Sequence, residues 1–330
     1  MILVTGATGL VGSHLLLHLL QNGEDVRALY KTQENVQKTK ALFQWKNQSD
    51  LFEKINWIQG CITEIPSLEI AFENIDYVYH CATVISFNPD DEEQLRKVNI
   101  EGTANIVNFC LAKNVKKLCY VSSIAALGDL QEHENIITEE TEWNPEKPHS
   151  DYGITKYGAE MEVWRGQEEG LKTVIINPGI ILGPGFWKNG SSEIFSRIKK
   201  GLKYYTKGAT GFTTVNDVVK IMISLMKSDI EKERFTIVSE IIPFEKLSRT
   251  IAKAFGKKEP SVYLNPRMTS IAWRLDWIIS KLFFQKRKLS RATAKAMHTK
   301  SNFDNSKIKN ALNFKFESID NYISEIKKTY

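Results

Sequence analysis

The sequence predicts an α/β fold, in which a doubly wound parallel sheet is followed by a smaller, mostly helical C-terminal part. Three observations predict it. Short apolar runs alternate with amphipathic helical stretches up to Pro178, a glycine-rich turn follows the first run, and the alternation loosens after Pro178. Strict alternation of strand and helix implies crossover connections, a parallel sheet and helices on both of its faces.

The elements follow in order along the chain. Strands are expected at residues 2–4, 25–30, 55–59, 76–80, 117–122 and 173–177, with a further candidate at 234–238. Helical spacing of apolar residues predicts helices at 12–22, 35–46, 68–73, 92–113, 152–169 and 192–201. We therefore expect a dinucleotide-binding domain over 1–178, segments near 212–238 that return to it, and a substrate-binding domain over 179–330.

Composition excludes several classes of function. The chain has 330 residues, 42% hydrophobic and 25% charged, with a net charge of +5 spread along its length, which gives no reason to expect nucleic-acid binding. Its four cysteines show no metal-binding spacing, so neither a metal site nor a disulfide framework is expected. No secretory signal precedes the first apolar run. We expect a cytoplasmic protein that acts on a small molecule, with a homodimer left open.

A glycine turn, residues 5–12, joins the first strand to the first helix and reads TGATGLVG. Gly6 would make the tight turn, Gly9 would let a pyrophosphate approach the backbone, and Gly12 would let helix and strand pack closely. The diphosphate would then meet the positive end of the helix. Thr8, Leu10 and Val11 complete this expected binding loop.

The end of the second strand usually decides between NAD and NADP. An acidic residue there binds the ribose hydroxyls of NAD, whereas a cation suits the 2′-phosphate of NADP. This strand ends in Tyr30-Lys31, with no carboxylate, and Lys38 or Lys40 could assist. The sequence therefore favours NADP(H), with NAD(H) as the alternative.

A candidate catalytic set lies further along the chain. Tyr152 and Lys156 are four residues apart, so on a helix they share one face. The cation beside the tyrosine favours its phenolate and brings its pKa towards neutrality, and Lys156 could also hold the ribose of the cofactor. Ser122 and Ser123 end the fifth strand, where a serine hydroxyl could donate to the substrate oxygen.

With these motifs the sequence resembles the extended short-chain dehydrogenase/reductase family, the NAD(P)-dependent epimerases and dehydratases, over nearly its whole length. The matching motifs are the glycine turn, His80-Cys81-Ala82, residues 98–103, the serine pair, YGITK at 152–156 and Asn177-Pro178-Gly179. The resemblance implies a Rossmann-type fold and an NAD(P)-dependent oxidoreductase.

The same resemblance implies roles for individual residues. Ser123, rather than Ser122, would be the catalytic serine beside Tyr152 and Lys156. Asn177 and Pro178 would lie beside the nicotinamide, and Ala82 and Thr83 near the ribose and phosphates. The family's acidic contact to adenine is replaced here by Ile62, which can offer only its backbone. For Asn99, a bond to a neighbouring strand or an ordered water near Lys156 are both open, and His80 is expected to be structural.

Two branches of the family compete. Nucleotide-sugar epimerases commonly carry an arginine that clamps a diphosphate, and residues 208–217 contain none. The chain is more similar to the dihydroflavonol-4-reductase and 3β-hydroxysteroid dehydrogenase branch, which implies a ketone or aldehyde reductase, or the reverse alcohol oxidation, on a small and rather apolar substrate. A sugar-nucleotide epimerase with tightly bound NAD and a non-catalytic dinucleotide sensor are the alternatives.

The sequence leaves the role of one segment undecided. Residues 271–288 contain Trp273, Trp277, Phe283 and Phe284, but Arg274, Asp276 and Lys281 interrupt the run, so it cannot span a membrane. The aromatic residues could rest on a membrane surface, with Lys286, Arg287 and Lys288 beside lipid headgroups. We expect instead that they form the core of the second part or a contact between subunits.

Overall fold

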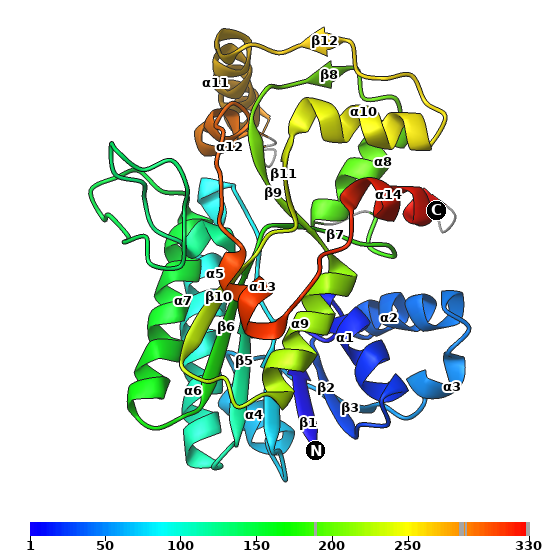
Figure 1. The fold of residues 1–330 in the computed structure, drawn as a ribbon, viewed down its shortest axis with the longest axis vertical. Helices are drawn as coiled ribbons and strands as arrows, with labels where there is room; N and C mark the ends of the chain where they lie inside the picture. The colour runs from blue at the N-terminus through cyan, green and yellow to red at the C-terminus, as the bar shows by residue number, and fades with distance from the viewer. Residues whose placement is uncertain (188–189, 284–286, 288, 328–330) are drawn as a thin grey trace.

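A seven-stranded parallel sheet forms the centre of the computed structural model, which describes residues 1–187, 190–283, 287 and 289–327 (Figure 1). The strand order is β10-β6-β5-β4-β1-β2-β3. The strands are β1 (Ile2–Thr5), β2 (Val26–Tyr30), β3 (Asn56–Gln59), β4 (Tyr77–His80), β5 (Lys117–Val121), β6 (Thr173–Pro178) and β10 (Glu233–Ile237). The predicted doubly wound α/β fold is confirmed, and each strand lies within one residue of its expected bounds.

The order of the strands reverses between β1 and β4. The chain runs outward through β2 and β3, then returns to place β4 on the other side of β1. At such a reversal the loops that follow the two strands diverge and leave a crevice at the carboxyl edge of the sheet. The glycine turn and the loop after His80 therefore meet at this point.

Alternate residues of the strands lie in two separate hydrophobic cores, one on each face of the sheet. Ile2 and Val4 point to the face covered by α1 (Leu10–Gln21), α2 (Gln33–Trp45) and α9 (Val215–Lys227), whereas Leu3 points to the face covered by α4 (Ile65–Ala71), α6 (Gly102–Ala112) and α7 (Asp151–Glu168). Because both faces are buried, the strands read as continuous apolar runs.

The expected helix over 92–113 is present but not regular. It is divided into α5 (Glu92–Leu95), a π-helical turn at Arg96–Glu101, and α6. Such a turn inserts a residue into the helical ladder and reorients the side chains that follow. A short helix that the sequence did not reveal, α3 (Ser49–Phe52), precedes β3.

Beyond β6 the chain adds two small sheets and several helices above the carboxyl ends of the main strands (Figure 1). One sheet contains β11 (Glu240–Pro243), β9 (Ala209–Thr214) and β7 (Ile180–Leu182), and the other pairs β12 (Val262–Tyr263) with β8 (Tyr204–Tyr205). The helices are α8 (Glu193–Lys199), α10 (Phe244–Ala254), α11 (Pro266–Leu282), α12 (Arg291–Ala296), α13 (Ser306–Leu312) and α14 (Ile319–Lys327). The domain boundary at Pro178 stays a prediction.

Among the described helices, none is long and apolar enough to cross a membrane.

Candidate active site

The glycine turn packs tightly against the loop after β4. Gly6 has a positive φ of 63°, and a Cβ built on it would lie 2.5 Å from backbone atoms of Cys81 and Ala82. A Cβ on Gly12 would lie 2.3 Å from the carbonyl oxygen of Gly6. Neither position accepts a side chain, so these two glycines are required for β1, α1 and β4 to meet.

The start of α1 fits a phosphate group. The helix begins at Leu10, and Gly9 before it supplies no side-chain cap. The first N–H groups of a helix lack partners within the helix, so those of the first turn at Leu10, Val11 and Gly12 can bind an anion. A Cβ on Gly9 would meet only the Gly6 carbonyl oxygen, at 3.3 Å, so this side of the cradle is open. Thr8 lies beside it, half-buried.

His80, at the end of β4, connects β1 to α6 through two hydrogen bonds. Its Nδ1 lies 2.6 Å from the Thr5 hydroxyl and its Nε2 lies 3.0 Å from the Thr103 hydroxyl. Because Thr103 donates its proton to the Asn99 carbonyl, His80 must donate through Nε2 and accept through Nδ1. Burial lowers the pKa of His80 to about 3. The histidine is thus neutral and structural, and not an acid or base.

Asn99, in the π-helical turn, ties the loop after β4 to α7. Its amide donates to the Val84 carbonyl and the Thr155 hydroxyl, at 3.0 and 3.1 Å, and its oxygen accepts from the Val84 N–H and the Thr83 hydroxyl. These contacts use both amide hydrogens and the oxygen. Asn99 therefore positions the loop that carries Ala82 and Thr83, which are half-buried.

The residues expected to meet the adenosine lie at the ends of β2 and β3. Tyr30 packs edge-on against Trp57, and Lys31 is exposed. The two lysines named as possible helpers have their own partners: Lys38 bonds to Asn35, and Lys40 lies 3.6 Å from Glu53. Among the described residues, Lys31 alone of the three lysines has no such partner.

Ile62, in the loop after β3, is also among the residues expected to meet the adenosine. Its side chain is buried against Gly102, and its carbonyl accepts a hydrogen bond from Asn105. Its N–H is the backbone group it could still offer to a ligand.

The structure brings Ser123 and Tyr152 together. Ser150 caps the first turn of α7 through a 3.1 Å hydrogen bond to the Gly153 N–H, which fixes Tyr152 at the start of the helix. Burial raises the pKa of the Tyr152 hydroxyl to about 12, while a hydrogen bond with Ser123 opposes that rise, so the expected shift of this pKa towards neutrality is wrong. Ser122 is buried on the other side, beside Glu160. The geometry therefore agrees with the choice of Ser123 over Ser122.

Lys156 lies behind the tyrosine, fully buried. Its ammonium donates to the Tyr120 hydroxyl at 2.6 Å and to the Val121 carbonyl at 2.9 Å. Burial lowers the pKa of Lys156 to about 7, and the negative charge of Glu160 opposes this. Tyr120 was missed in the sequence because it reads as one more apolar residue of β5.

A buried polar network supports Ser123 from the side of β6. The Asn177 amide donates to the Ser123 carbonyl at 3.0 Å and to Glu160 Oε1 at 2.5 Å. Arg234 on β10 lies 3.2 Å from Glu160 Oε2 and also donates to the Glu139 carbonyl. Sequence reasoning missed Glu160, although Tyr152, Lys156 and Glu160 are spaced four residues apart and so share one face of α7.

The model of the NAD dependent epimerase/dehydratase family matches residues 2–238 of this chain. The chain belongs to that family. Members of this family are NAD(P)-dependent oxidoreductases and epimerases, so the protein is an NAD(P)-dependent enzyme of the extended short-chain dehydrogenase/reductase type, as the motifs predicted.

Two curated relatives of this family member match most of its length. Sterol demethylase protein B of Methylococcus capsulatus is 26% identical over 287 residues, covering 86% of this chain and 84% of the relative. Anthocyanidin reductase of Arabidopsis thaliana is 29% identical over 269 residues, covering 73% and 78%. Reductases of the dihydroflavonol 4-reductase kind are thus among the relatives, in agreement with the resemblance seen in the motifs.

Two solved structures share the fold over the whole chain. The crystal structure of gox2253 has a TM-score of 0.81 at 24% identity and covers 100% of this chain and 97% of its own. UDP-glucose 4-epimerase of Thermotoga maritima, solved with UDP-glucose, has a TM-score of 0.78 at 21% identity and covers 99% and 97%. At these identities the likeness establishes the fold.

In this family member, apolar side chains border the tyrosine. The ring of Phe87, in the loop after β4, packs edge-on against Tyr152 with 5.7 Å between the ring centroids. Phe87 is still 49% exposed, and its neighbour Ile85 is 55% exposed. Exposed apolar side chains therefore lie beside the Tyr152 ring.

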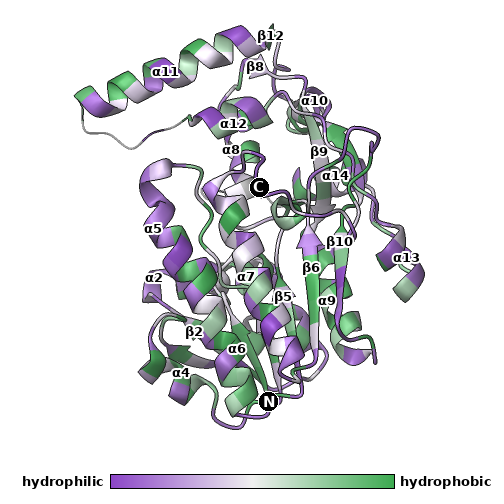
Figure 2. Ribbon diagram, turned by 90° about the vertical axis from the view of Figure 1, so that its left-hand side faces the viewer, coloured by the Kyte–Doolittle hydropathy of each residue, from purple (hydrophilic) through white to green (hydrophobic). Residues whose placement is uncertain are grey.

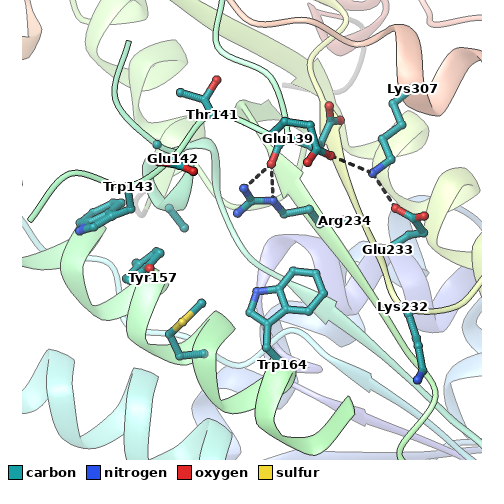
Figure 3. Close-up of a pocket in the computed structure, with 14 residues that line it drawn as sticks. Glu139, Thr141, Glu142, Trp143, Tyr157, Trp164, Lys232, Glu233, Arg234 and Lys307 are labelled. Atoms are coloured by element: carbon teal, nitrogen blue, oxygen red, sulfur yellow. Dashed lines mark hydrogen bonds and ion pairs between the residues drawn. The ribbon is translucent and has the colours of Figure 1, made fainter. Parts of the chain in front are cut away.

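A separate surface pocket lies on another face of α7 and is drawn in Figure 3. Tyr157 and Trp164 line it from α7, facing Glu139, Arg234 and Lys307. It contains neither Tyr152 and Lys156 nor the glycine turn, so it is not the expected cofactor crevice.

Proposed function

We propose that the protein is an NADP(H)-dependent oxidoreductase that reduces a ketone or aldehyde on a small apolar molecule, or oxidises the matching alcohol. The observation that carries the proposal is the half-exposed Phe87 ring packed on Tyr152, beside Ser123. This arrangement offers a proton and a hydrogen-bond donor on a surface that is otherwise apolar.

Each catalytic residue has a role that its surroundings support. Tyr152 stays protonated near neutral pH because its pKa is raised, so it can give a proton to a carbonyl oxygen. Ser123 donates a hydrogen bond to the same oxygen as negative charge develops there. The buried ammonium of Lys156 lowers the free-energy cost of the tyrosinate that remains. A nicotinamide cofactor in the crevice contributes hydride transfer.

The preference for NADP(H) rests on Lys31. This cation stands at the end of β2, where the acidic residue that selects NAD is absent, and it is exposed. An exposed ammonium with no competing partner can approach a 2′-phosphate at little cost in desolvation.

A second candidate is a nucleotide-sugar epimerase with tightly bound NAD, favoured by the full-length similarity to the UDP-glucose 4-epimerase fold. Against it, residues 208–217 contain no arginine. A buried diphosphate without a cationic partner would be costly to bind.

The decisive experiment measures cofactor oxidation with a panel of apolar ketones, aldehydes and UDP-sugars, using NADPH and NADH separately. The proposal expects steady consumption of NADPH with an apolar carbonyl and slower consumption of NADH. Interconversion of UDP-sugars without net consumption of cofactor would contradict the reductase proposal and indicate an epimerase. Saturable binding of NADPH with no turnover of any substrate would instead indicate a dinucleotide sensor.

A further inference from the structure

Helix α11 carries its apolar side chains on the outside of the molecule. Six of them are between 42% and 68% exposed, and within the whole helix only Thr269 is buried. The six are Met268, Ile271, Leu275, Ile278, Ile279 and Leu282, which we call the apolar stripe. The segment's aromatic residues were predicted to form a core or a contact between subunits. The core is wrong for Trp277 and Phe283, which are also exposed, and the subunit contact stays a prediction. Phe284 lies outside the described residues.

The spacing of the stripe makes it one continuous surface. Its members recur at intervals of three and four residues, so they occupy one side of the helix. At 1.5 Å per residue the stripe is about 21 Å long. Figure 2 shows α11 projecting from the body of the molecule near β12, with hydrophobic and hydrophilic residues alternating along it.

Two polar side chains, Thr269 and Asp276, lie on the opposite side of the helix and hold it in place. Thr269 meets His298 at 2.8 Å. Asp276 accepts a hydrogen bond from the Leu289 N–H at 3.2 Å and lies 3.9 Å from Arg287. A helix that packs on a protein core turns its apolar side inward, whereas α11 turns its apolar side outward. The contacts of Thr269 and Asp276 fix α11 in this orientation.

A row of cations runs along one flank of the stripe. Arg267, Arg274 and Lys281 are seven residues apart, so they lie above one another on the helix, and all three are exposed. Arg274 and Lys281 also stand over the rings of Trp273 and Trp277. The one acidic residue of α11 is Asp276, on the inward side.

We infer that α11 docks on the surface of an anionic lipid bilayer, lying in the plane of the interface. An apolar stripe beside a cationic flank matches acyl chains beside phosphate groups, whereas α11 is too short and too charged to cross the bilayer. If two copies packed stripe on stripe with their helices antiparallel, their cationic flanks would lie side by side, and each Asp276 is turned inward and could not offset the repulsion. Charge complementarity therefore selects the lipid.

The binding of the full-length protein to vesicles tests the inference. Co-sedimentation with phosphatidylcholine vesicles that contain phosphatidylserine should exceed that with pure phosphatidylcholine several-fold, and raised salt should weaken it. The double variant Leu275→Asn, Ile279→Asn should lose binding. Arg274→Glu with Lys281→Glu should lower the partition coefficient about 10-fold or more.

A matched control is available on α4, where Ile65 and Ile70 are exposed to a similar degree. Ile65→Asn with Ile70→Asn should bind vesicles as the wild type does. Turnover of a soluble substrate measures whether each variant is folded. Absence of vesicle binding, or equal binding by the stripe variant and the wild type, would overturn the inference. So would a wild-type dimer that the stripe variant dissociates, without any binding to lipid.

Discussion

Glu160 on α7 and Asn177 on β6 are joined by a hydrogen bond of 2.5 Å between Oε1 and Nδ2. The other hydrogen of the same amide is given to the Ser123 carbonyl at 3.0 Å. A buried carboxylate thus fixes the backbone of the candidate catalytic serine through one intermediate side chain. We regard Glu160 as a positioning residue.

Replacing Glu160 by glutamine should slow turnover without unfolding the enzyme. The variant keeps the side-chain shape but loses its charge, which faces Arg234 and lies near Lys156. We expect kcat to fall about 10-fold, equivalent to about 1.4 kcal/mol. Because Glu160 raises the pKa of Lys156, its loss should move the alkaline limb of kcat/KM for the cofactor to lower pH.

The control for this variant is Glu168→Gln, at the exposed end of the same helix. It should leave both kcat and the pH profile unchanged. A Glu160→Gln enzyme with a lower kcat but an unmoved pH profile would show that its charge does not act on Lys156.

Two glycines of the glycine turn should respond differently to alanine. At Gly12 the added Cβ meets backbone at 2.3 Å, so Gly12→Ala should lose about 3 kcal/mol of unfolding free energy. At Gly9 the backbone is extended, and an added Cβ would lie 3.3 Å from the Gly6 carbonyl oxygen. The unfolding free energy of Gly9→Ala should therefore stay within about 1 kcal/mol of that of the wild type.

Gly9→Ala should nevertheless weaken dinucleotide binding at least about 10-fold, because its Cβ enters the phosphate cradle. Urea unfolding and fluorescence titration measure the two effects. Unchanged affinity in Gly9→Ala would mean that the diphosphate does not lie over the start of α1.

Lys31→Ala should lower kcat/KM for NADPH and leave that for NADH nearly unchanged. The loss of one charged contact to a phosphate should lower kcat/KM for NADPH about 10-fold. Lys38→Ala serves as the control, because Lys38 is bonded to Asn35. Steady-state kinetics with each cofactor gives the ratio of kcat/KM for NADPH to kcat/KM for NADH. If this ratio is the same in the wild type and in Lys31→Ala, the argument for NADP(H) is lost.

Acid should destabilise the fold through buried histidines. Burial lowers the pKa of His14, like that of His80, to about 3, whereas an unfolded histidine titrates near 6.5. Between these values the unfolded chain binds more protons, so the unfolding free energy falls as pH falls, by up to about 1.4 kcal/mol per pH unit for each histidine.

Urea unfolding at about pH 7 and about pH 5 measures this slope. His14→Gln should flatten it, and His133→Gln, at an exposed site, should not. A slope that is the same in all three proteins would show that His14 is not held neutral.

The sheet could be predicted because its strands are buried on both faces. Residues such as Ile2, Leu3 and Val4 form short apolar runs that differ clearly from the helices between them. Three strands of the C-terminal part, β8, β9 and β12, gave no such signal. β9 contains Thr210 and Gly211, and β8 and β12 have two residues each.

The candidate site was predicted only where a motif carries it. The positions of Ser123, Tyr152 and Lys156 follow from spacing and from strand ends, and the structure brings the three together. Tyr120 and Glu160 were not found, because their roles depend on which side chains face each other across β5, β6 and α7. The outward orientation of α11 was also hidden, since an amphipathic pattern does not say which face meets the protein.

The central claim is that Tyr152 and its neighbours reduce an apolar carbonyl at the expense of NADPH. The most direct measurement uses NADPH that carries deuterium at both C4 positions of the nicotinamide and follows the label by mass spectrometry, with wild type, Tyr152→Phe and Tyr157→Phe. We predict one deuterium in the product alcohol with wild type and Tyr157→Phe, and a rate at least about 100-fold lower with Tyr152→Phe. An unlabelled product, or a Tyr152→Phe enzyme as fast as the wild type, would contradict the account.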